Sequence, residues 1–347
     1  MISPLSAQPL VFDEAQFTQA LAPVLSGLLG GDGRIEVVDR VSGNINLVLK
    51  FAYGGRPLGA RVALNAHRFR YEPGIIKEVF AVLLLAYGSG RVGDARLRQI
   101  VDALLRRPTG SHINHRWVRP ILYYDWSRAV LPYAFFIFEW VEGQPLWNTP
   151  GADLYAKAGA DLARLHGLDF EHFYPDIFAI DRRAQDWRER FQAAWSKELA
   201  EAAPALPAGI SAALARLDID AITPGVPCLV HNDYTGGNIL VEPRGGLRLI
   251  DWDNWVVDCA ELDLVKMKYW TAVGSKGLLA PRPDLYAAFR RGYEAAAPRP
   301  VDEGRLAAYE RLWLLRTFNF ERTRDGAETV SWQAVYPPAD TYPGLLA

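Results

Sequence analysis

Cysteine is scarce in this chain of 347 residues, which holds only Cys228 and Cys259. Two cysteines cannot form the network of disulfides that stabilises small secreted domains, so a disulfide scaffold is excluded. We expect both side chains to be buried, reduced thiols, as is usual in a cytoplasmic protein.

Long apolar runs and an excess of charge of one sign are also lacking. No stretch is apolar over the length of a membrane span, and the first residues, MISPLSAQPLVFDEAQF, lack the basic start and apolar core of a signal peptide. The net charge of −2 gives no reason to expect a surface for nucleic acid. We therefore expect a cytoplasmic, globular protein without nucleic-acid or membrane partners. The sequence does not indicate its oligomeric state.

The pattern of apolar residues divides the chain into a part rich in strands and a part rich in helices. Five early runs have the composition of strands: IEVVDRV, INLVLKFAY, LGARVAL, PILYYDW and PYAFFIFEWV. A helical insertion near residues 88–116 separates the third run from the fourth, and later patterns are almost all helical. We predict an α+β, two-lobed fold. Residues 1–141 form an N-terminal lobe with a five-stranded antiparallel sheet, and residues 142–347 form a helical lobe with one small hairpin.

Two polar motifs follow apolar runs in the second part of the chain. LVHNDYTGGNILV places Asp233 and Asn238 five residues apart, with Gly236 and Gly237 between them. LRLIDWDNW follows almost at once and places Asp251 just after a short apolar run. Apolar strands around polar loops predict a hairpin that presents these side chains at a common edge.

These residue types suit phosphoryl transfer from a nucleotide. That reaction needs a carboxylate that orients the acceptor hydroxyl, oxygen ligands that hold Mg²⁺ against the phosphates, and a cation that binds the phosphates from the other side. Asp233, Asn238 and Asp251 are a set of oxygen ligands of the kind that Mg²⁺ takes. We expect Gly236 and Gly237 to let the loop turn tightly enough to bring Asn238 back toward Asp233.

The motif pair HNDYTGGNIL and LIDWDN resembles the catalytic and metal-binding motifs of the aminoglycoside phosphotransferase family, which is similar to choline kinases and has a protein-kinase-like fold. The resemblance implies that Asp233 is the catalytic aspartate and that Asn238 and Asp251 bind Mg²⁺. It further implies that His231 braces the catalytic loop, and that Asp263, in ELDLV, is a structural aspartate.

The resemblance also implies where the purine binds. FEWVEGQPL, which contains Phe138, Glu139 and Val141, is similar to the segment that joins the lobes in this family and whose backbone binds the base. A large aromatic ring at Phe138, just before this linker, indicates that GTP is accepted as well as ATP. The alternative is that Phe138 packs as core beneath the linker and that ATP is the donor.

Four residues are implied to bind or support the phosphates. SGNIN, with Ser42 and Asn46, is similar to the family's loose phosphate loop. Arg61 takes the place of the usual strand lysine, with Glu78 as its partner on the following helix. The planar guanidinium group of arginine binds phosphate well, which makes this exchange chemically reasonable. The alternative is that Arg61 is a solvated strand residue.

We therefore predict a Mg²⁺-dependent small-molecule kinase that transfers the γ-phosphate of ATP or GTP to a hydroxyl of an antibiotic, such as a nucleoside or a glycoside, and so confers resistance. The modest acidity of the helical part argues against a polycationic acceptor and favours a neutral or weakly charged one. Two alternatives remain open: a choline or sugar kinase of the same fold, and a catalytically inactive, nucleotide-binding regulatory module.

Overall fold

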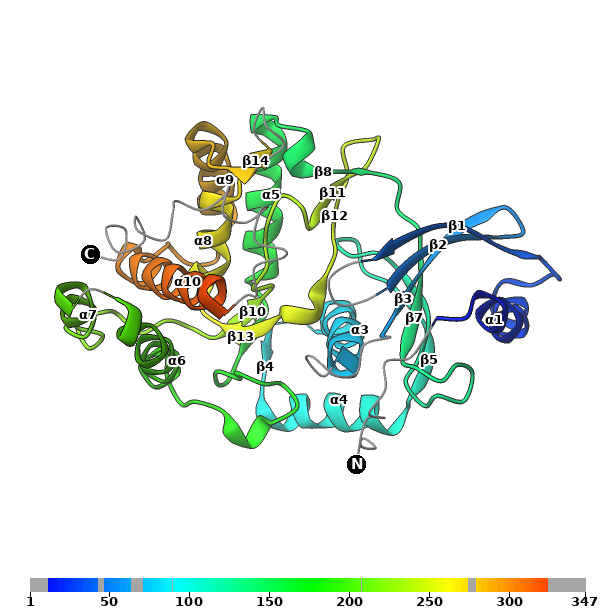
Figure 1. Cartoon of the computed structure of the whole chain (residues 1–347), viewed down its shortest axis with the longest axis horizontal. Coiled ribbons are helices and arrows are strands. Elements are labelled where there is room, and N and C mark those ends of the chain that lie inside the picture. Colours follow the sequence, from blue (N-terminus) through cyan, green and yellow to red (C-terminus); the bar gives the residue numbers. More distant parts are fainter. Residues whose placement is uncertain are drawn as a thin grey trace. The chain divides into compact units, whose positions relative to one another are not determined.

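The computed structural model describes residues 12–42, 47–63, 71–88, 90–206, 208–273 and 279–323 (Figure 1). Their contacts group the chain into two compact units. Unit 1 comprises residues 1–89, 95–143 and 240–255, and unit 2 comprises residues 90–94, 144–239 and 256–347. This grouping differs from a single cut at residue 141. The short helix η4 (Trp252–Asn254) packs on helix α3 (Tyr71–Tyr87), so the segment around it belongs with the N-terminal sheet.

Unit 1 contains a six-stranded antiparallel sheet in the order β1, β2, β3, β7, β6, β5. The strands are β1 (Ile35–Ser42), β2 (Leu47–Tyr53), β3 (Arg56–Val62), β5 (Thr109–Ile113), β6 (Ile121–Asp125) and β7 (Phe135–Glu139). The sequence predicts five of these six strands. The predicted number was one too low, because the strand at the sheet edge, β5, was missed. In its sequence, TGSHI, only Ile113 is buried, so β5 lacks the apolar alternation by which strands are recognised.

The side chains of β3 alternate between the two faces of the sheet, which determines the face to which Arg61 points. Leu58, Ala60 and Val62 are buried in the core beneath helix α1 (Glu14–Leu29). Neighbouring residues of a strand point to opposite faces, so Arg61 points to the face away from α1. Figure 1 shows α1 and α3 on opposite sides of this sheet. Helix α4 (Asp94–Arg106) follows α3 and occupies the predicted helical insertion.

Unit 2 is mainly helical. Its helices are α5 (Ala152–Leu165), α6 (Trp187–Ala202), α7 (Ala208–Leu214), α8 (Glu261–Tyr269), α9 (Pro283–Ala296) and α10 (Glu303–Thr323). Helices α5 and α9 cross at Gly159 and Gly292, where a Cβ atom on either glycine would collide with the backbone of the other helix. Among the helices that the structure describes, none combines the length and the apolar character that crossing a membrane requires.

Short strands position the two polar motifs. Within unit 2, β10 (Cys228–Val230) pairs with β13 (Val256–Asp258) and with β9 (Asp169–Phe170), which in turn pairs with β4 (Arg91–Val92). Strands β11 (Ile239–Val241) and β12 (Leu247–Leu249) are neighbours in a second small sheet and form the predicted hairpin. The first motif is therefore the loop between β10 and β11, and the second follows β12.

The two cysteines lie in this region. Cys228 begins β10 and Cys259 follows β13, and both side chains are buried and free. Burial raises the pKa of each thiol well above its usual value, so both remain protonated and unreactive.

Candidate active site

The loop between β10 and β11 is held by the first turn of α8. The carboxylate of Asp263 accepts the backbone N–H groups of His231 and Asn232, both at 2.7 Å. Its other contact is His166, whose Nε2 lies 3.2 Å from Oδ2 in a fully buried site. His231 in turn accepts the N–H of Asp233 on Nδ1 at 3.2 Å. Asp263 and His231 thus fix the backbone on the N-terminal side of Asp233.

Asn232 adopts a left-handed backbone conformation with φ of 63°. Asparagine tolerates this conformation better than most residues. Asn232 directly precedes Asp233 in the loop after β10. Conformations of this kind often occur at functional sites, where the surrounding structure holds them.

The carboxylate of Asp233 lies between a cation and an amide. Its Oδ1 is 2.7 Å from Nζ of Lys266, and its Oδ2 accepts a hydrogen bond from Nδ2 of Asn238 at 3.1 Å. Burial raises the pKa of Asp233, but the Lys266 charge and these hydrogen bonds outweigh burial and hold the pKa below its usual value. Asp233 is therefore ionised at neutral pH, as a group that orients an acceptor hydroxyl must be. Lys266, on α8, was not predicted from the sequence.

The two glycines of the loop have a different role from the one expected. Neither Gly236 nor Gly237 has a positive φ, so the turn does not require a left-handed glycine. Instead both lie against Trp147, where a Cβ on Gly237 would overlap the indole ring. The N–H of Trp147 also donates to the carbonyl of Gly236 at 3.3 Å. The glycines allow close approach of this side chain, and Asn238 is brought back to Asp233 by its own amide group.

Replacing Gly237 by alanine should therefore displace the loop or Trp147. Overpacking of this kind typically lowers the free energy of unfolding by about 1–3 kcal/mol. Gly209, in α7, has no atom within 4 Å of a built Cβ, so Gly209→Ala is a matched control that should leave stability unchanged or higher. Thermal unfolding of both variants tests this, and equal stabilities would contradict the role of Trp147.

A buried cluster in unit 1 surrounds Arg61. One guanidinium nitrogen forms an ion pair with Glu78 on α3 and lies 2.8 Å from Oδ1 of Asp251, while the other lies 2.8 Å from Oδ2 of Asp253. Arg61 is only 5% exposed and Glu78 only 2% exposed, so Arg61 is not a solvated strand residue. Burial lowers the pKa of Arg61, but the three carboxylates together raise it above its ordinary value, so its charge is permanent.

Arg119 is a second, partly buried cation that the sequence reasoning missed. One of its guanidinium nitrogens lies 3.1 Å from Oε1 of Glu78, the carboxylate oxygen that does not pair with Arg61. The centre of the guanidinium group lies 3.7 Å from the ring centroid of Phe138. The Phe138 ring is 1% exposed and lies directly over Gly59 of β3, where a Cβ would collide with it. Phe138 therefore packs as a core residue between β3 and Arg119. No sequence pattern marks Arg119, because its partners come from α3 and β7.

The remaining predicted nucleotide residues are distributed as follows. Asn46 lies outside the described residues, and Ser42 ends β1 with its side chain outside them. The backbone N–H of Glu139 donates to the carbonyl of Pro120 at 3.0 Å, so this N–H group is already used within the protein. Val141 follows β7, and no hydrogen bond is assigned to its backbone N–H among the described residues.

The predicted Mg²⁺ ligands offer suitable oxygen atoms. Asn238 donates its amide N–H groups to the backbone carbonyl and the carboxylate of Asp233, which leaves its Oδ1 without an assigned donor among the described residues. Asp251 has φ of 65°, a left-handed conformation at the start of η4. Amide and carboxylate oxygens are the ligands that Mg²⁺ prefers, so both residues fit this ion.

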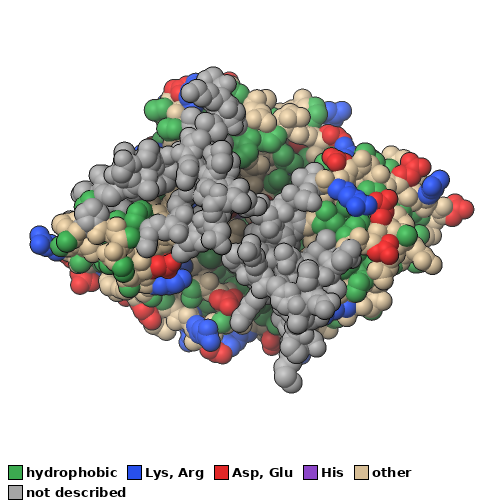
Figure 2. Space-filling view, viewed as in Figure 1, with side chains coloured by type: hydrophobic (Ala, Val, Ile, Leu, Met, Phe, Trp, Pro, Cys, Tyr) green, Lys and Arg blue, Asp and Glu red, His purple; other side chains and the backbone are tan. Residues whose placement is uncertain are grey.

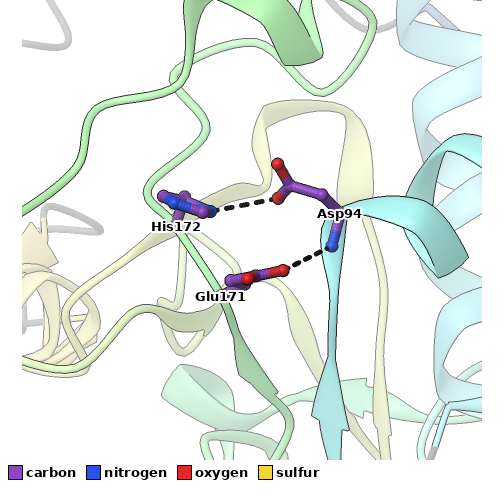
Figure 3. Close-up of side chains that lie close together, drawn as sticks. All are labelled: Asp94, Glu171 and His172. Atoms are coloured by element: carbon purple, nitrogen blue, oxygen red, sulfur yellow. Dashed lines mark hydrogen bonds and ion pairs between the residues drawn. The ribbon is translucent and has the colours of Figure 1, made fainter.

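A further group in unit 2 has the composition of a metal site. Ligand atoms of Asp94, Glu171 and His172 lie within 4.8 Å of one another (Figure 3). Both oxygens of Asp94 are already used: Oδ1 accepts from Tyr174 and lies 3.1 Å from His172, and Oδ2 lies 3.1 Å from Arg183. Glu171 accepts the N–H of Asp94 at 2.9 Å. Since the guanidinium supplies the positive charge that an ion would bring, we interpret this group as a polar junction at the start of α4.

Comparison with known proteins identifies the family. Residues 101–309 match the profile of the phosphotransferase enzyme family. This chain belongs to that family. A search of curated protein sequences gave no match. The phosphotransferase family match includes the catalytic loop, Asp251 and the whole of α8.

Solved structures confirm the protein-kinase-like fold. A candidate aminoglycoside phosphotransferase of Ralstonia eutropha is 18% identical, with a TM-score of 0.61 over 95% of this chain and 98% of that one. A spectinomycin phosphotransferase in complex with ADP and spectinomycin is 12% identical, with a TM-score of 0.53 over 95% and 94% of the two chains. The macrolide 2′-phosphotransferase of Brachybacterium faecium is 14% identical, with a TM-score of 0.57 over 92% and 98%. At these identities the likeness establishes the fold of this phosphotransferase and not its acceptor.

Proposed function

We propose that this phosphotransferase is a small-molecule kinase that transfers the γ-phosphate of ATP or GTP to a hydroxyl group of an antibiotic. The observation that carries the proposal is the state of Asp233: an ionised carboxylate, oriented by Lys266 and Asn238, on a loop fixed by Asp263. A carboxylate held in this way accepts a hydrogen bond from an acceptor hydroxyl and takes up its proton as the phosphoryl group is transferred.

The other proposed roles follow from the charges of the groups. Asn238 and Asp251 would hold Mg²⁺, which supplies positive charge to the phosphates when it is bound. Arg61, which forms an ion pair with Glu78 on α3, would bind the phosphates of the nucleotide. The backbone of Val141 would bind the purine base. Structural neighbours of this chain have been solved with ADP and with AMP-PNP, which supports a nucleotide as co-substrate.

The choice between ATP and GTP rests on Phe138. Its ring packs against Gly59 and is covered by Arg119, which is the core packing that the ATP alternative also describes. We propose that a ring fixed in this place limits how deeply a base enters beside the linker. Guanine and adenine present different donors and acceptors to the linker, so a fixed ring at this point affects which of them fits. We propose that GTP is accepted. Steady-state rates with each nucleotide test this, and a strict preference for ATP that Phe138→Met leaves unchanged would contradict it.

The acceptor is proposed to be an antibiotic because structural neighbours of this chain include spectinomycin and macrolide phosphotransferases. A phosphorylation screen tests this directly. Hydroxylated antibiotics and hydroxylated metabolites, including choline and sugars, would be incubated with the enzyme and either MgATP or MgGTP. Phosphorylation of choline or a sugar alone would identify a metabolic kinase. Nucleotide binding without transfer or hydrolysis would identify an inactive module.

Asp251→Asn should raise the Mg²⁺ concentration needed for half-maximal activity and weaken nucleotide binding by at least about tenfold, because it removes a charged ligand. Asp253→Asn is the matched control, since both carboxylates pair with Arg61 but only Asp251 is proposed to bind the ion. Titrations of activity and of nucleotide binding against Mg²⁺ compare the two. Equal effects of the two substitutions would place the metal site elsewhere.

A further inference from the structure

One face of α8 contacts the catalytic loop at two points. Asp263 and Lys266 are three residues apart, a spacing that places side chains on the same face of a helix. Asp263 binds the backbone before Asp233, and Lys266 binds the side chain of Asp233 itself. The cation beside the proposed catalytic carboxylate therefore comes from a helix and not from the loop.

The ammonium group of Lys266 has hydrogen-bond donors that Asp233 does not use. An ammonium group has three N–H donors, and one of them is used by Asp233. The other contact assigned to Lys266 among the described residues is the ring of Trp270, whose centroid is 5.8 Å from Nζ. The Lys266 side chain is about one-fifth exposed, at 22%. Asp233 and Lys266 thus form an ion pair with unused donors, and Asp233 is not an isolated negative charge.

The acidic residues of the neighbouring helices also have partners within the protein. Every acidic side chain of α8, α9 and α10 that the structure describes has a basic or polar partner. These pairs are Glu261 with Arg305, Asp263 with His166, Asp284 with Arg282, Glu294 and Glu303 with Arg290, and Glu310 with Lys268. Figure 2 shows basic and acidic side chains close together on the face in view. A ligand with several ammonium groups would have to compete with these internal partners for the carboxylates of α8, α9 and α10.

We propose that Lys266 determines the charge of the acceptor: the enzyme takes a hydroxyl compound that carries no ammonium group next to the reacting hydroxyl, and Lys266 excludes polyamines. The inference rests on the proposed function, because it assumes that the acceptor binds beside Asp233. It assigns Lys266 as a specificity residue. Like charges at a binding interface suppress the wrong partner, and an ammonium group beside Asp233 would meet the charge of Lys266.

Binding of the polyamine kanamycin at low salt, measured by calorimetry, tests the role of Lys266. Wild type should bind kanamycin weakly, and Lys266→Met should bind it about tenfold more tightly or better, because the substitution leaves Asp233 unpaired. Lys266→Arg should bind it as weakly as wild type, since it keeps the charge. Lys197→Met is the matched control: Lys197 is exposed on α6, so this variant has the same net charge as Lys266→Met but keeps the ion pair at Asp233.

Tight binding of kanamycin to wild type would overturn the proposal. A Lys266→Met variant that binds kanamycin no more tightly than Lys197→Met would overturn it as well. Circular dichroism confirms that each variant is folded. The binding measurement needs no turnover, so its result is separate from that of the proposed function. Absence of phosphoryl transfer in wild type would contradict the proposed function. Kanamycin binding that is the same in Lys266→Met as in Lys197→Met would contradict only the role of Lys266.

Discussion

Asp233→Asn should reduce turnover by about 10²–10⁴-fold while leaving nucleotide affinity nearly unchanged. The substitution keeps the size of the side chain but removes the group that takes up the acceptor proton, and this group contributes chiefly to the transition state. Steady-state kinetics combined with calorimetric titration of the nucleotide separate the two effects. Because the ion pair holds the pKa of Asp233 below its usual value, the wild-type carboxylate stays ionised as pH falls from 8 to 6. Loss of activity in that range would come from another group.

The control for this prediction is Asp153→Asn. Asp153 is exposed in the first turn of α5, where the same chemical change should leave turnover unaltered. A loss of nucleotide affinity in Asp233→Asn that matches its loss of turnover would contradict the assigned role. It would indicate that Asp233 supports the nucleotide rather than the acceptor.

Arg61→Met should have the largest effect on stability. The substitution leaves Glu78, Asp251 and Asp253 without their shared cation in a site where Arg61 and Glu78 are almost fully buried. Removing one partner of a buried pair typically lowers the free energy of unfolding by about 3–5 kcal/mol. Arg119 still contacts Glu78, which favours the lower end of that range.

Denaturant unfolding measures this loss. Arg56→Met is the matched control, because Arg56 is also on β3 but forms an exposed pair with Glu139. Exposed pairs contribute about 0–1 kcal/mol, so this control should unfold at nearly the wild-type midpoint. Equal stabilities of the Arg61 and Arg56 variants would contradict the account of the cluster.

The parts of the fold with regular apolar patterns were predictable from the sequence. Strands β1, β2, β3, β6 and β7 and helices α5, α6, α9 and α10 carry such patterns, and the structure contains them. The edge strand β5 does not, because hydrogen bonds to β6 hold it with almost no apolar burial. The pairing of Arg61 with Glu78 was implied by the family resemblance, and the structure contains it.

Residues that depend on packing between distant segments were not predictable. Lys266 is 33 residues from Asp233, and its contact depends on the rotation of α8 about its axis. Arg119 reaches Glu78 across 41 residues and covers a ring on another strand. Gly237 requires the absence of a side chain because Trp147 lies there, which no local pattern indicates. In each case the partner is set by tertiary packing.

The most direct test of the account is to detect the transferred phosphoryl group. Wild type and Asp233→Asn would each be incubated with MgATP or MgGTP and a set of hydroxylated antibiotics and metabolites, and the products analysed by mass spectrometry. The account predicts that wild type yields a phosphorylated, uncharged or weakly charged hydroxyl compound together with the nucleoside diphosphate, and that Asp233→Asn yields almost none. Equal product formation by both proteins would contradict the central role of Asp233.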